Sequence, residues 1–370
     1  MLRGWRIGSL AGIAIEINSS WLIIFGIFLA SLGSGHFPQH FPQAPAWQHW
    51  AAALAATLLL FFSVLIHEIS HSLVARTYGL GVSRITLFIF GGVAQSEGEP
   101  KTALSELWVA IIGPLTSVGV SGISYGLGWL TEQAAAAQIS AGVFQFNGML
   151  NLWLAGFNMV PAFPLDGGRV LRACIWYLTD DLLNSTRIAT IFGKAFGYLL
   201  MGLGLFTLLF THNIFGLYTL GLGWLLTVVA TNAFQSVRLQ VMLQGVTAGH
   251  LMRPARALVD PTWPVQYVVD NYFAPYRLTS LPVVHGRQVV GILHLDSVRS
   301  VDPGNWPHLP VHQIMEPLDP EADLISADTD AVEALQLMMR EQKDYLLVTD
   351  AEGLAGTLSE ADLAAATQQL

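Results

Sequence analysis

The chemistry of this chain centres on an H-E-x-x-H pattern, His67-Glu68-Ile69-Ser70-His71. Positions four apart lie on one face of a helix, so His67 and His71 can direct a ring nitrogen at one metal ion. Glu68 lies about 100° further round the helix, within reach of a water on that ion without being a ligand. Ala51 to Ile66 carry no charge, so the pattern lies in a helix of the transmembrane type. Ionisable side chains are costly in such a helix, and those that occur there usually have a function. The alternative is that both histidines are buried polar residues that join helices.

A third metal ligand is expected between Asn158 and Arg169, where two prolines and two glycines interrupt a helix. Catalytic zinc usually takes three protein ligands and a water, and the single cysteine, Cys174, excludes thiolate-rich zinc sites. Irregular backbone at membrane depth is tolerated where protein buries it or it lines a polar cavity, so Asp166 can point inward. The alternative is that Asp166 caps the helix that follows, over residues 167–177.

The composition separates a membrane part from a soluble part. The 370 residues are 53% hydrophobic and 12% charged, which argues against one ordinary soluble domain. Residues 1–244 hold 10 basic and 9 acidic side chains, and residues 245–370 hold 7 and 17, so the net charge of −9 is +1 and −10. An acidic second part disfavours nucleic acid as a partner.

The first part predicts a polytopic α-helical membrane protein with six transmembrane helices in contact with the lipid bilayer. Its apolar segments are residues 21–32, 50–78, 104–130, 137–160, 188–210 and 214–231. The first is slightly short of the ~20 residues that a straight crossing needs. If the leader, residues 1–19 with Arg3 and Arg6, is cytoplasmic, every Lys and Arg outside the spans falls on the cytoplasmic side. The chain is therefore expected in the plasma or inner membrane with both termini cytoplasmic.

Two connections in the first part also carry candidate residues. Ile85, Leu87 and Ile89 alternate with other residues before a Gly-Gly pair, which predicts a short hairpin or sheet element. Its exposed edge could pair with an extended substrate peptide, and the alternative is a plain connecting loop. His36 and His40 fall between residues 33 and 47, where we expect a solvated loop rather than a metal site.

The sequence resembles the site-2 protease family, whose members are intramembrane zinc metalloproteases. The resemblance rests on the H-E-x-x-H in an apolar helix, on Phe90-Gly91-Gly92-Val93-Ala94, and on N-x-x-P-x-x-P-L-D-G-G starting at Asn158. It covers residues 20–238. There is no PDZ-like insertion between the second and fourth spans, which is a departure from members that bind substrates through such a domain.

The resemblance implies a zinc site and its mechanism. His67, His71 and Asp166 would bind one Zn²⁺, Glu68 would be the general base, and Asn158 would lie near the bound water or the substrate carbonyl. The implied reaction is metal-assisted hydrolysis of a peptide bond in a single-span membrane protein. The substrate helix must unwind locally, because an intact helix hides its carbonyls in hydrogen bonds.

Residues 245–370 contain an internal repeat. The pieces begin at Thr247-Ala-Gly-His-Leu-Met-Arg-Pro and at Val311-His-Gln-Ile-Met-Glu-Pro, and each continues with a helix and two apolar strands. This looks like a soluble α/β pair of cystathionine-β-synthase (CBS) domains, residues 245–303 and 308–370, after a membrane domain of residues 1–240. Such a pair packs with pseudo-symmetry and could form a homodimer.

The CBS resemblance also implies an adenine nucleotide site. The G-x-x-[ST]-x-x-D string that holds ribose and phosphate in that family is complete in the second repeat as Gly356, Ser359 and Asp362. The first repeat keeps Gly291 but has His294 and Ser297 at the polar positions, so it supports no ordinary site. A dimerisation or rigid regulatory module without a nucleotide stays open.

Two other classes of function remain as alternatives. A CBS-regulated transporter or channel could use the buried His, Glu and Asp as an ion path, but six spans without an internal repeat disfavour it. A catalytically silent membrane scaffold is disfavoured by the intact Glu68.

Overall fold

The computed structural model describes residues 4–96, 98, 100–133, 138–254, 258–276, 278–286, 288–341, 343–351 and 353–369. Arg3 and Ala137, which belong to the predicted leader and fourth span, lie outside these residues. The chain forms two compact units, Met1–Val237 and Arg238–Leu370, each with its own core.

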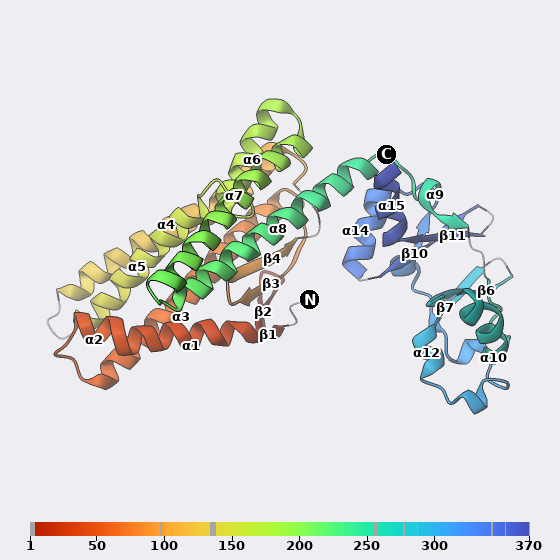
Figure 1. Ribbon diagram of the computed structural model, residues 1–370, viewed down its shortest axis with the longest axis horizontal. Coiled ribbons are helices and arrows are strands. Elements are labelled where there is room, and N and C mark those ends of the chain that lie inside the picture. Colours follow the sequence, from red (N-terminus) through yellow and green to blue (C-terminus); the bar gives the residue numbers. More distant parts are fainter. Residues whose placement is uncertain are drawn as a thin grey trace. The chain divides into compact units, whose positions relative to one another are not determined.

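The first unit is a bundle of long helices (Figure 1). Its helices are α1 (Ser19–Ser31), α2 (Phe37–His40), α3 (Ala46–Thr77), α4 (Ala103–Glu132), α5 (Gln138–Asn158), α6 (Asp166–Thr179), α7 (Leu182–Phe210) and α8 (Phe215–Leu243). A π-helical turn, Leu32–His36, joins α1 to α2. The prediction of a loop around His36 and His40 is therefore wrong: apolar packing of Leu32 and Phe37 continues the helix through both histidines.

Among the described residues, five helical segments are long and apolar enough to cross a membrane: residues 19–40, 46–77, 103–132, 182–210 and 215–243. The predicted fourth span is the helix α5, which is less apolar because it carries asparagines on a buried face. Asn147 donates to Ser124 of α4 at 2.9 Å, and Asn151 donates to Ser63 of α3 at 3.0 Å. The polar groups of α5 thus bind neighbouring helices.

Helices α7 and α8 approach each other through glycines. A Cβ on Gly204 would lie 2.6 Å from the carbonyl oxygen of Gly216, and one on Gly223 would lie 2.5 Å from that of Gly197. Small residues at such contacts let two helix backbones meet closely, which is how helices associate where no hydrophobic force drives them together.

The first unit also contains a four-stranded mixed β-sheet. Its strands are β1 (Gly4–Leu10), β2 (Ile13–Asn18), β3 (Val82–Phe88) and β4 (Gly91–Ser96), which pair in the order β1-β2-β3-β4. The leader is therefore a β-hairpin, closed by Ala11 and Gly12 at positive φ, and β2 pairs in parallel with β3.

The predicted exposed edge at Ile85, Leu87 and Ile89 is wrong. Strand β3 has β2 on one side and β4 on the other, Ile85 and Leu87 are buried, and Ile89 lies in the turn that follows. The sequence could not reveal this because the partner strand β2 comes from the leader, about 70 residues earlier. Within the described residues, β4 and β1 are the terminal strands of this sheet.

The second unit contains two sheets that exchange strands. One has the order β5 (Arg253–Pro254), β11 (Gly353–Ser359), β10 (Tyr345–Asp350) and β9 (Leu324–Ser326); the other has β6 (Ser280–His285), β7 (Gln288–His294) and β8 (Glu316–Pro317). The start of the first repeat thus pairs with the second repeat, and the start of the second pairs with the first. This exchange joins both repeats into one unit.

Helices complete the second unit. They are α9 (Ala248–Leu251), α10 (Val265–Val268), α11 (Ala274–Tyr276), α12 (Leu295–Arg299), α13 (Pro320–Asp323), α14 (Ala331–Glu341) and α15 (Glu360–Gln369), with a π-helical turn, Val269–Phe273, between α10 and α11. Each repeat has its own apolar core, one around Leu346 and Leu358 and the other around Leu281 and Leu293.

Candidate metal centre

Three predicted ligand side chains meet in the helix bundle. His67 and His71 come from α3, and Asp166 is the first residue of α6; all three are buried. Oδ2 of Asp166 lies 3.1 Å from Nε2 of His67 and 3.2 Å from Nε2 of His71, and the two Nε2 atoms are 3.2 Å apart. Tetrahedral zinc with ligands at 2.0–2.1 Å separates its donors by about 3.3 Å, so this spacing suits one such ion.

The partners of the other ring nitrogens indicate where the imidazole protons can lie. Nδ1 of His71 is 2.5 Å from the carbonyl oxygen of Val109, which can only accept, so Nδ1 carries the proton. Nδ1 of His67 is 2.9 Å from the hydroxyl of Ser117. Both Nε2 atoms can therefore present a lone pair, and with the Asp166 carboxylate they form three converging acceptors. Such an arrangement suits a bound cation.

Gly113 of α4 leaves the space that an ion needs. A Cβ at this position would lie 2.8 Å from Nε2 of His67 and closer still to Nε2 of His71. Any other residue would therefore fill the point at which the donors converge. The residues present fit a zinc ion.

Close backbone packing places Asp166. It follows an irregular segment, residues 159–165, and the residue before it, Leu165, makes no side-chain cap. Gly167, Gly168 and Gly193 let this segment approach α6 and α7, because a Cβ on any of them would collide with its backbone. The alternative that Asp166 caps its helix is wrong: its carboxylate faces the imidazoles.

One face of α4 supports the whole centre, which the sequence did not indicate. Glu106, Val109, Gly113 and Ser117 recur at helical spacing, and the last three contact or face the two histidines. An acidic residue at the start of an apolar run was a signal that could have singled out Glu106.

Glu68 directly follows the ligand His67 on α3. A Cβ on Gly92 of β4 would be 2.6 Å from Cγ of Glu68, so the Glu68 side chain packs directly against the β4 backbone. Asn158 is the half-buried last residue of α5, just before the segment that leads to Asp166.

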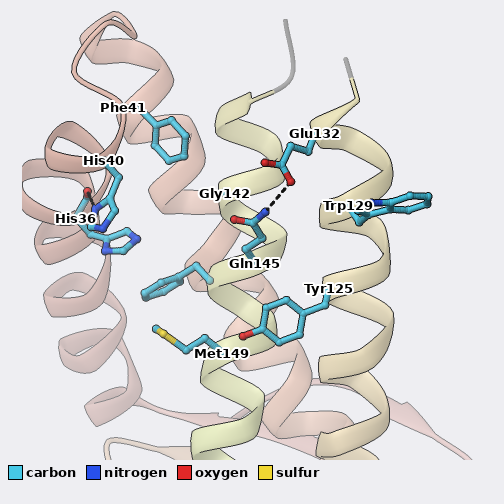
Figure 2. Close-up of a pocket in the computed structure, with 10 residues that line it drawn as sticks. His36, His40, Phe41, Tyr125, Trp129, Glu132, Gly142, Gln145 and Met149 are labelled. Carbon is cyan, nitrogen blue, oxygen red and sulfur yellow. Dashed lines mark hydrogen bonds between the residues drawn. The ribbon is translucent and has the colours of Figure 1, made fainter. Parts of the chain in front are cut away.

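A cavity of about 470 Å³ lies elsewhere in the bundle (Figure 2). It is lined by the histidines of the α1–α2 segment, the last turns of α4 and the first turns of α5, and Glu132 accepts a hydrogen bond from Gln145 across it. The rings of His36 and His40 are tilted by 32° and have centroids 4.2 Å apart. Among the described His, Cys, Asp and Glu side chains, one group of three lies close enough together to hold a metal ion: His67, His71 and Asp166. The residues that line this cavity therefore do not form a second metal site.

In the second repeat of the second unit, the predicted nucleotide string forms a local network. Ser359 and Asp362 exchange hydrogen bonds, with the Ser359 hydroxyl 2.5 Å from Oδ2 of Asp362. Arg253 of β5 forms an ion pair with Oδ1 of the same carboxylate. A Cβ on Gly356 would meet the backbone of Arg253, so this glycine is needed for the exchanged strand.

In the first repeat the corresponding position holds His294, and charged side chains of the second repeat lie beside it. Nδ1 of His294 lies 2.9 Å from the Ser280 hydroxyl, and its Nε2 lies 3.2 Å from Glu316. Lys343 is 3.7 Å from the same Glu316 carboxylate and 2.8 Å from that of Asp323, whose hydrogen bond raises the pKa of Lys343 above its ordinary value. This agrees with the departure of the first repeat from the nucleotide string.

Apolar helices around a buried three-donor centre define a membrane-embedded metallohydrolase, and comparisons with known proteins agree. The family model "Peptidase family M50" matches residues 55–134 and 128–203, and the CBS domain model matches residues 248–304 and 311–368. A Synechocystis protein named "Putative zinc metalloprotease sll0528" is 31% identical over 97% of this chain and 94% of its own length.

Similarity to Methanocaldococcus jannaschii is found both among curated proteins and among solved structures. The zinc metalloprotease MJ0392 is 28% identical over 97% of this chain and 94% of its own length. The solved structure of a site-2 protease has 27% identity and a TM-score of 0.45, and the match covers 62% of this chain and 94% of that one. The chain belongs to peptidase family M50, the site-2 protease family of zinc metalloproteases, and carries two CBS domains. This sets aside the transporter and the scaffold.

Proposed function

We propose that this metalloprotease cleaves single-span membrane proteins within or beside the bilayer, using one zinc ion held by His67, His71 and Asp166. The observation that carries the proposal is the buried convergence of Asp166 with two histidines of α3, an apolar helix that is long enough to cross a membrane. A soluble peptidase would have no need to bury its ligands in such a helix.

The residues around the metal centre would have separate roles in hydrolysis. Zinc, when bound, would act as a Lewis acid that polarises the substrate carbonyl and lowers the pKa of the attacking water to about 7. Glu68 takes a proton from the attacking water and delivers it to the leaving amine as the C–N bond breaks. The Val109 carbonyl keeps the His71 proton on Nδ1, and the Ser117 hydroxyl can accept the corresponding proton of His67. Asn158 is suited to hydrogen-bond the water or the substrate carbonyl.

The substitution Glu68→Gln separates catalysis from metal binding. Because Glu68 is not a ligand, we expect Glu68→Gln to retain one zinc per chain and to cleave a membrane-spanning reporter 10²- to 10⁴-fold more slowly. Zinc content and reporter cleavage are measured on the same purified protein. Retained cleavage by the zinc-loaded variant would remove Glu68 from this role.

We propose that the substrate binds as an additional strand on β4, in place of the edge expected at Ile85, Leu87 and Ile89. Within the described residues β4 has one partner strand, β3, and its Gly92 packs on Glu68. An extended peptide on this edge would have its backbone beside the general base.

We propose further that α5 is a sixth crossing and that both termini are cytoplasmic. The polar residues of α5 bind α3 and α4, so its lower hydropathy does not expose them to lipid. The distribution of Lys and Arg supports the orientation, which would place His67 and His71 near the cytoplasmic side of a plasma or inner membrane.

The soluble unit is proposed to regulate cleavage from the cytoplasm. Its second repeat keeps Gly356, Ser359 and Asp362, the residues that suit an adenine nucleotide, and a homodimer through the CBS pair would be a second means of control. Both proposals rest on the resemblance of the repeat to nucleotide-binding CBS domains.

A further inference from the structure

A buried ion pair links α4 to α6 close to the metal centre. Glu106 of α4 is fully buried and Arg172 of α6 is 2% exposed. Nε of Arg172 lies 2.7 Å from Oε1 of Glu106, and its Nη2 contacts the same oxygen. Arg169, one turn earlier on α6, is further away, with its Nε 3.9 Å from that oxygen, and is partly exposed.

This pair connects the third ligand to the helix that orients the other two. Val109 and Ser117 of α4 fix the imidazoles of His71 and His67, and Glu106 lies one turn before Val109 on the same helix. Asp166 begins α6, and Arg172 lies less than two turns further along it. Helix α4 is therefore the common support of all three ligands, two through hydrogen bonds and one through the ion pair.

The ion pair adds a side-chain contact to the backbone packing of Gly167 and Gly168 at the start of α6. The chain reaches Asp166 through an irregular segment that contains two prolines, and no side chain caps the start of α6. A fully buried charge pair gains little net stability, because desolvation opposes the attraction, but it allows only a narrow range of geometries. The planar guanidinium, which contacts one carboxylate oxygen through two nitrogens, restricts the rotation of α6 more than a lysine would.

We propose that Glu106 and Arg172 are positioning residues that hold Asp166 in register with His67 and His71, so that the three donors match one zinc ion. The pair acts through Asp166 and touches neither the metal nor the substrate. The proposal rests on the metal site proposed above, and it concerns residues outside the H-E-x-x-H and L-D-G-G motifs.

Zinc affinity of the full-length protein tests the proposal without relying on cleavage. The variants are Glu106→Gln, Arg172→Lys and the exchanged pair Glu106→Arg with Arg172→Glu. The control is Glu16→Gln, which removes an ion pair with Arg84 at 3.8 Å in the sheet of the same unit. Zinc dissociation constants are measured by chelator competition, and the visible spectrum of the Co²⁺-loaded protein reports the ligand geometry.

We expect Glu106→Gln and Arg172→Lys to bind zinc at least about tenfold more weakly and to alter the Co²⁺ bands. The exchanged pair should recover most of the affinity, and Glu16→Gln should match the parent protein. If Glu106→Gln fails to fold, Arg172→Lys decides, because it keeps the charge. A folded Arg172→Lys protein with parental zinc affinity and an unchanged Co²⁺ spectrum would overturn the proposal. A parent protein that binds no zinc would instead refute the metal site itself.

Discussion

At the scale of single residues, the centre depends on groups that are not ligands. His71 can present Nε2 because the carbonyl of Val109 holds the proton on Nδ1, and Ser117 can do the same for His67. Gly113 contributes by having no side chain. The motif thus supplies donors, and α4 supplies their protonation state and the space between them.

This dependence predicts that Gly113→Ala abolishes zinc binding although it changes no ligand. The added methyl would occupy the point on which both Nε2 atoms converge, so at least one imidazole must turn away. Zinc content of the purified protein measures the effect. Gly119→Ala is the matched control, because a Cβ there on the same helix meets nothing within 4 Å. Stoichiometric zinc in Gly113→Ala would show that the ion lies elsewhere.

The sequence predicted the metal centre better than its surroundings. His67, Glu68 and His71 follow from spacing alone, and Asp166 follows from a broken helix together with the family resemblance. Ser117, Val109 and Glu106 were not predictable in the same way, because their contacts depend on how α4 is rotated against α3 and α6. The burial of Arg172 could not be predicted from the sequence, because it depends on the same packing of α6 against α4.

At the scale of elements, the apolar runs predicted the helices well and the sheet poorly. Helices α3, α4, α7 and α8 overlap their predicted spans, because runs of apolar residues between charged or broken segments leave few alternatives. The β1–β2 hairpin could not be predicted, because β1 has no buried face and so no alternation of buried and exposed residues. Its large apolar side chains Trp5, Ile7 and Leu10 are all exposed. Without β2, nothing in residues 82–88 could reveal an interior strand.

The edge of β4 gives a prediction at this scale. A photo-crosslinking amino acid at Val93, which is half-exposed on β4, should capture a membrane-spanning substrate bound to the Glu68→Gln protein. The same label at Trp5, exposed on the opposite terminal strand β1, is the control and should capture little. Equal capture at both positions, or capture at Trp5 alone, would exclude β4 as the substrate strand.

At the scale of the whole molecule, the chain combines a metalloprotease unit with a CBS pair whose repeats exchange their first strands. Gly356 and Gly291 have matching roles in this exchange, since a Cβ on either would collide with the backbone of the incoming strand. The repeats differ in their polar groups: Asp362 has Arg253 as its ion-pair partner, whereas His294 has Glu316. The internal repeat was predicted from the sequence, but the exchange of strands was not.

The difference in polar groups between the two repeats predicts that each chain binds one nucleotide. Calorimetric titration of the full-length protein with ATP, ADP and AMP should give heat with at least one of them, and Asp362→Asn should weaken that binding at least about tenfold, because a charged hydrogen bond to ribose is lost. Ser297→Ala, at the matching position of the first repeat, should leave it unchanged. No heat with any of the three nucleotides would leave the CBS pair a structural or dimerisation role.

The zinc K-edge X-ray absorption spectrum of the intact protein tests the central claim most directly, because it reports the donors around the ion. We predict one zinc per chain, bound only by nitrogen and oxygen at about 2.0–2.1 Å, with the scattering pattern of two imidazoles. Substitution of Asp166 by alanine should change this spectrum or remove the zinc. A sulfur donor at about 2.3 Å, or a spectrum that is identical in the Asp166→Ala protein, would contradict the account.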